Sequence, residues 1–111
     1  MDMFSALAEP TRRSIIEMLA TKGQLPASVI YDKFPASPPA ISQHLKVLRE
    51  AKLVQMEKQA QKHIYKINTK SLRKLEDWAN KMATMWNERF DRLDTVLQTL
   101  KITDKHYGKR K

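Results

Sequence analysis

The side chains best equipped for chemistry in this chain gather in one short stretch, residues 37–49, which is rich in hydrogen-bonding groups and cations. The Gln43 amide can pair bidentately with an adenine edge, whereas Lys46 and Arg49 suit phosphate. The other candidates in this stretch are Ser37, Pro39, Ser42 and His44. The alternative is that all of them form only the solvated face of a helix.

A helix over residues 38–51 is expected to position these side chains. Ser37 precedes a proline, which favours the extended backbone of an N-cap, and Pro38 suits the first helical position. Its buried face is predicted by Ile41, Leu45 and Leu48, which recur at i, i+4 and i+7. The positive end of such a helix favours a nearby phosphate.

Three shorter helices are predicted before it, over residues 2–8, over residues 10 to about 21, and from Pro26 to just before Pro35. Pro10 suits the first position of the second helix, and Gly23 follows its end, where left-handed backbone is needed. The side chains expected to face inward are Ile15, Ile16, Met18, Leu19, Val29, Ile30 and Phe34.

After residue 52 the apolar residues recur at every second position, which predicts a β-hairpin. Val54 and Met56 alternate in the first strand, and residues 63–67 form the second. The link over residues 58–62 contains neither Gly nor Asn, so we expect a loose tip rather than a tight turn. Lys58, Lys62 and His63 lie near this tip, from which they can reach a nucleic-acid backbone or minor groove.

Residues 70–100 are predicted to form one long helix of about 45 Å, with apolar residues spaced by three or four, close to a heptad pattern. One small domain cannot cover so long a seam, so we expect the same helix of a second subunit to pair with it. The predicted interface comprises Met3, Phe4, Leu7, Leu75, Trp78, Met82, Trp86, Phe90, Leu93 and Leu97. Residues 1–100 then form one domain, and residues 101–111 a basic, frayed tail.

The amino-acid composition limits the classes of protein to which this chain can belong. The chain has 111 residues, 41% of them hydrophobic, and a net charge of +9. The absence of cysteine excludes disulfides, cysteine-bound zinc, iron–sulfur clusters and thiolate chemistry. No apolar run approaches the roughly 20 residues of a membrane span, and Asp2 stands where a signal peptide is basic, so we expect a cytoplasmic protein without membrane contact. Residues 37–68 and 101–111 each carry a net charge of +4, which favours a polyanionic partner, although a solvated basic surface is the alternative.

Other classes of function have weaker support. The three histidines, at positions 44, 63 and 106, fall on different elements, so we expect no metal and no cofactor. An enzyme is disfavoured because the chain has no Gly-rich nucleophile turn or phosphate loop. The alternative of an RNA-binding or protein-interaction winged helix remains. However, the hairpin offers only Tyr65 for base stacking, which favours duplex DNA.

The predicted order of four helices, a hairpin and a long helix describes a winged helix-turn-helix. The segments 6–13 and 37–51, followed by Leu53, Val54 and Tyr65, resemble ArsR-type winged-helix repressors. The long helix, with Trp78, Trp86 and Phe90, resembles a subgroup without the metal-sensor cysteines. The resemblance implies a mainly α fold with a small hairpin, and a homodimeric repressor that binds specific double-stranded DNA; it names no effector.

Three positions depart from the family pattern. Glu9 stands where the family usually has Asp, which makes it a poorer helix cap. Lys52 stands where Gly is common, and a left-handed backbone at this lysine costs about 1 kcal/mol. Pro38 replaces an often polar, base-contacting residue; it cannot hydrogen-bond a base but can touch a thymine methyl group.

Overall fold

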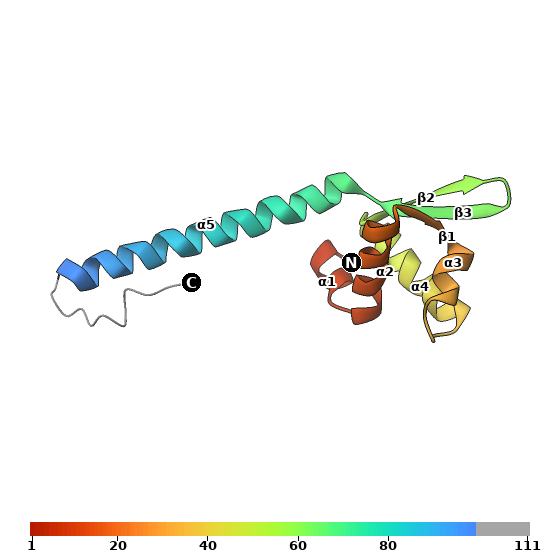
Figure 1. The fold of residues 1–111 in the computed structure, drawn as a ribbon, viewed down its shortest axis with the longest axis horizontal. Coiled ribbons are helices and arrows are strands. Elements are labelled where there is room, and N and C mark those ends of the chain that lie inside the picture. Colours follow the sequence, from red (N-terminus) through yellow and green to blue (C-terminus); the bar gives the residue numbers. More distant parts are fainter. Residues whose placement is uncertain (100–111) are drawn as a thin grey trace. The chain divides into compact units, whose positions relative to one another are not determined.

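The computed structural model describes the backbone of residues 1–99 and the side chains of residues 1–96. In chain order the elements are α1 (Met3–Leu7), α2 (Pro10–Lys22), β1 (Gln24–Pro26), α3 (Ala27–Asp32), α4 (Pro38–Glu50), β2 (Val54–Gln59), β3 (Lys62–Ile67) and α5 (Thr69–Thr99) (Figure 1). The mainly helical class with a small antiparallel sheet is as predicted. The chain divides into two units, residues 1–73 and the part from Lys74 onward, and each is described by itself.

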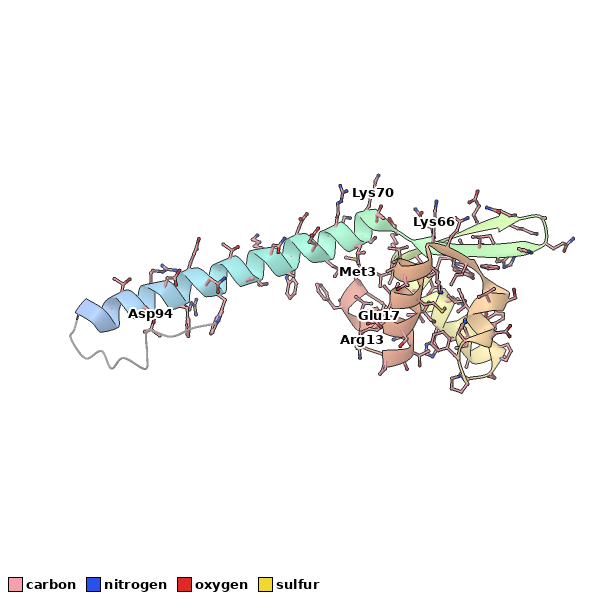
Figure 2. The ribbon with its side chains drawn as sticks, in the orientation of Figure 1. Met3, Arg13, Glu17, Lys66, Lys70 and Asp94 are labelled. Atoms are coloured by element: carbon pink, nitrogen blue, oxygen red, sulfur yellow. The ribbon has the colours of Figure 1, made fainter. Side chains whose placement is uncertain are left out.

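Side-chain hydrogen bonds join the first two helices. The Glu9 carboxylate caps α2 by accepting from the Arg12 N–H at 2.9 Å. The Arg12 Nε donates to the Ala6 carbonyl at 2.7 Å, and the Arg13 guanidinium donates to the Leu7 carbonyl at 2.7 Å. Figure 2 shows Arg13 where α1 and α2 meet. Both arginines thus satisfy carbonyl groups at the end of α1, which would otherwise lack partners.

The sheet has three strands in the order β1-β3-β2, and the strand β1 is a feature that the sequence did not predict. Leu25 of β1 and Met56 of β2 both pair with Tyr65 of β3. The hairpin tip also differs from the prediction. Gln59 pairs with Lys62, so the turn contains two residues and is tight, and Ala60 in this turn has a left-handed φ of 55°.

The core of the first unit lies between the helices and the sheet. Its buried hydrophobic side chains are Ala6, Ile15, Leu19, Ile30, Ile41, Leu45, Leu48, Ala51, Leu53, Val54, Ile64 and Tyr65. The predicted buried face of α4 is therefore confirmed. Four side chains expected to face inward are only half-buried, namely Ile16, Met18, Val29 and Phe34. Phe34 lies beyond the helix because α3 ends at Asp32, earlier than predicted.

The helix α5 begins at Thr69, one residue before the predicted start, and it is described as far as Thr99; the predicted end at residue 100 lies outside the described residues. The Asn68 side chain accepts a hydrogen bond from the Lys70 N–H at 3.2 Å, and this bond explains the start of the helix. The predicted contact of Leu97 and the predicted fraying of residues 101–111 lie outside the described residues. Among the described helices, none is both long enough and apolar enough to cross a bilayer.

Candidate nucleic-acid interface

The helix α4 presents a polar face to solvent. Ile41, Leu45 and Leu48 are at most 1% exposed and anchor the opposite face in the core. The exposed side chains that follow its polar face are Ser42, Gln43, Lys46 and Arg49. The helix therefore offers one amide, one hydroxyl and two cations on a surface of the size that enters a DNA major groove.

The start of α4 has a different chemistry from the rest of the helix. The Ser37 hydroxyl caps it by accepting from the Ala40 N–H at 3.4 Å, and the Ser37 carbonyl accepts from the Ile41 N–H at 3.0 Å. Pro38 and Pro39 have no N–H. Residues 38–41 therefore have no free backbone N–H with which this end of the helix could bind phosphate, contrary to the expectation from the sequence. Ser37, Pro38 and Pro39 themselves are exposed.

His44 lies on the flank of α4 rather than on its exposed face. Its Nδ1 is 3.3 Å from a guanidinium nitrogen of Arg12 and 4.0 Å from the Glu9 carboxylate, and its side chain is 22% exposed. Because a guanidinium only donates, this contact is a hydrogen bond in the tautomer whose Nδ1 carries no proton. His44 thus links α4 to the start of α2 through Nδ1, which leaves Nε2 for the predicted DNA contact.

The Glu9 carboxylate beside His44 is held in its charged form. The hydrogen bond from the Arg12 N–H lowers the pKa of Glu9 below its usual value, and the nearby Arg12 charge acts in the same direction. Glu9 therefore does cap α2, although its side chain is longer than the expected Asp.

The hairpin gathers the predicted cations near its tip. In the register of the two strands Lys58 lies opposite His63 and Gln59 lies opposite Lys62, and all four side chains are exposed. A groove of about 230 Å³ lies between this tip and α3, and its lining includes Ser28, Tyr31, Lys62 and His63. No local pattern marks Ser28 or Tyr31 in the sequence, because α3 reaches the hairpin only through the pairing of β1 with β3.

A second open groove, of about 600 Å³, lies where α4 meets the base of the hairpin. Arg49, Lys52 and Lys66 contribute three cations to its lining, and Glu57 contributes one acid. The side chain of Lys66 points away from the helices (Figure 2). Neither Lys52 nor Lys66 was predicted from the sequence to contact DNA, although both belong to the segment with a net charge of +4. Their position beside Arg49 extends the basic surface beyond α4.

The end of α4 also explains the conformation of Lys52. The Leu53 N–H donates to the Leu48 carbonyl at 2.9 Å, and the Lys52 N–H donates to the Arg49 carbonyl at 3.0 Å. These two bonds form a Schellman motif, which requires left-handed backbone at Lys52, and its φ is 65°. The left-handed lysine that the sequence suggested is therefore present.

The helix α5 exposes large apolar side chains. Met82, Met85, Trp86, Leu93 and Val96 are 36–61% exposed, with Trp86 the most exposed of them. Trp86 also stacks on Phe90, with ring centroids 5.8 Å apart. Among the other predicted interface residues, Trp78 is 50% and Phe4 48% exposed, whereas Met3, Leu7, Leu75 and Phe90 are half-buried. With Leu72, seven large apolar side chains in the described part of α5 thus lie at least a third open to solvent.

In the part of the chain that the structure describes, no three side chains of His, Cys, Asp or Glu type come close enough together to hold a metal ion.

Comparisons with known proteins agree with this arrangement. A helix-turn-helix domain family matches residues 7–57, a span that holds α2, α3 and α4. The transcriptional repressor SdpR of Bacillus subtilis is 34% identical over 77 residues, which cover 69% of this chain and 84% of that repressor. A solved structure of a possible transcriptional regulator for arsenical resistance is 36% identical, with a TM-score of 0.67, over 86% of this chain and 95% of that one. An ArsR-like transcriptional regulator from Rhodococcus is 27% identical, with a TM-score of 0.70, over 86% of this chain and 87% of that one.

Proposed function

This chain belongs to the ArsR-type family of DNA-binding helix-turn-helix transcriptional regulators, and from that membership we propose that it acts as a homodimeric repressor in the cytoplasm. Its operator is double-stranded DNA with an inverted repeat. Bound there, the protein blocks access of RNA polymerase. Because its relatives are transcription regulators, catalysis has no part in this proposal.

The observation that carries the proposal is the exposed polar face of α4. In it, Gln43 is the side chain that reads a base edge, because an amide can both donate to and accept from adenine. Lys46 and Arg49 contact phosphate and fix the position of the helix in the groove. At the hairpin, Lys58, Lys62 and His63 contact the flanking backbone without reading sequence.

Dimerisation is supported by the exposed apolar side chains of α5. A monomer rarely leaves so many large apolar groups open to water along one helix, and a second copy of the same helix matches them in length and chemistry. In such a dimer the two α4 helices enter successive major grooves about 34 Å apart. An inverted repeat in the operator then mirrors the two-fold symmetry of the protein.

Selection of bound sequences from a pool of random duplexes tests this function. We expect an inverted repeat whose half-sites are centred about 10–10.5 base pairs apart. Single-stranded RNA of random sequence, added as a competitor, should not displace the selected duplex. The proposal is contradicted if no duplex is enriched, or if the RNA displaces the selected duplex from the protein. Either result favours an RNA-binding or protein-interaction module.

A further inference from the structure

An exposed, uncharged segment, apolar except for Ser37, precedes the polar face of α4. It comprises Pro35, Ala36, Ser37, Pro38 and Pro39, all of which are exposed and none of which carries a charge. Pro38 is four residues before Ser42, and Pro39 is four residues before Gln43, so the two prolines lie on the same side of the helix as its polar face, one turn earlier. A groove that receives Gln43 therefore also receives these rings.

The first turn of α4 has no free backbone hydrogen-bond donor for DNA. Neither proline has an N–H, the Ala40 N–H is engaged by the Ser37 hydroxyl, and the Ile41 N–H is engaged by the Ser37 carbonyl. From Pro38 to Ile41, no backbone donor is left for a phosphate or a base. The pyrrolidine rings offer only CH₂ groups, so the contact they make is apolar.

The major groove presents one apolar group to such a ring, the 5-methyl group of thymine. The other base edges present donors and acceptors, which would lose water against a proline without gaining a partner. We infer that Pro38 and Pro39 are specificity-determining residues that select thymine in each half-site through its methyl group. This inference rests on the proposed operator binding and adds a base preference that the polar face of α4 does not supply.

The contribution of one methyl group sets the size of the effect. Removing a buried methyl or methylene group from an apolar contact weakens it by about 0.8 kcal/mol, which corresponds to about fourfold in affinity. Uracil differs from thymine only in lacking this methyl group, so an exchange of thymine for uracil isolates the contact. A 5-methylcytosine carries the same methyl group, so it should satisfy the rings better than unmodified cytosine at the same position.

The test takes the selected duplex and replaces its thymines by uracil, one position at a time, with the Kd of the full chain measured for each duplex. We expect one thymine in each half-site at which uracil raises the Kd about fourfold, and no effect at thymines outside the contacted bases. At least one of the variants Pro38→Ala and Pro39→Ala should bind the thymine duplex and the uracil duplex with the same Kd at that position. Helix content from circular dichroism verifies that both variants are folded.

The outcomes separate this inference from the function on which it rests. If no duplex is enriched, the proposed function fails and the inference fails with it. If a duplex is enriched but uracil is tolerated at every position by the unaltered chain, only the inference is overturned; this arm needs no variant and so does not depend on how the substitutions fold. Sensitivity to uracil that stays the same in both proline variants also overturns it, because another side chain then contacts the methyl group.

Discussion

The substitution Trp86→Asp tests whether α5 is the dimer interface. Trp86 is 61% exposed, and a large aromatic side chain can bury about 250 Å², so about 150 Å² of each ring is open to a partner. At about 25 cal/mol per Å², complete coverage contributes about 4 kcal/mol per ring, and a symmetric dimer contains two such rings. Losing only a third of this total weakens dimerisation about 100-fold.

Sedimentation equilibrium across a range of concentrations measures this change. We expect the unaltered chain to form dimers at micromolar concentration and Trp86→Asp to remain a monomer with unchanged helix content. Thr84→Asp is the matched control, because it adds the same charge to the same helix about 200° around the axis from Trp86, and it should dimerise normally. A Trp86→Asp chain that still dimerises as tightly as the unaltered chain would refute the reasoning and place the interface elsewhere.

Three further predictions concern the ends of helices and the basic surface. Lys52→Gly should raise the free energy of unfolding by about 0.5–1 kcal/mol in urea titrations because it relieves the left-handed lysine, whereas Lys46→Gly in the helix interior should lower it by about 1 kcal/mol; a destabilised Lys52→Gly chain would contradict the assigned strain. Since the folded-state pKa of Glu9 is lowered, its charge stabilises the fold above its usual pKa, and this stability is lost as the pH falls through the lowered value. Glu9→Gln can still accept the Arg12 hydrogen bond but should lose less stability between about pH 5 and pH 3; identical acid profiles would argue against this role. Finally, a dimer in which each chain neutralises four phosphates should show a slope of about −7 for log affinity against log salt, and a flat dependence would exclude the electrostatic contacts.

Much of the fold could be predicted from local pattern. The start of α4 follows from Ser37 and the two prolines, and its buried face follows from the spacing of Ile41, Leu45 and Leu48. The strand β1 could not be predicted, because Gln24, Leu25 and Pro26 have no alternating pattern and a proline is a poor strand residue. These residues become a strand only by pairing with β3, about forty residues later in the chain.

In the candidate site, too, the features set by local pattern could be predicted, and those set by contacts between distant residues could not. The exposure of Gln43, Lys46 and Arg49 could be read from helical spacing, since they fall opposite the buried face. The position of His44 could not, because its contacts with Arg12 and Glu9 join residues more than thirty positions apart. The tight turn at Ala60 was missed for another reason. Alanine rarely adopts a positive φ, and here the pairing of the two strands imposes it.

The contacts of Arg12 suggest why α4 is held in a fixed position. Its guanidinium reaches the Ala6 carbonyl of α1 and the Nδ1 of His44 in α4, while its backbone N–H is capped by Glu9. One side chain therefore ties together the three helices around the polar face. Such preorganisation lowers the entropy that must be lost when α4 enters a groove.

The most direct test of the central claim, that the exposed face of α4 reads bases, compares Gln43→Ala with Lys62→Ala on the selected duplex and on duplexes altered at one position. Gln43→Ala should relax the base preference at a single position by about 1–3 kcal/mol. Lys62→Ala should weaken all duplexes to the same extent and leave the preference intact. Equal losses of base preference in the two variants, or none in Gln43→Ala, would contradict the account.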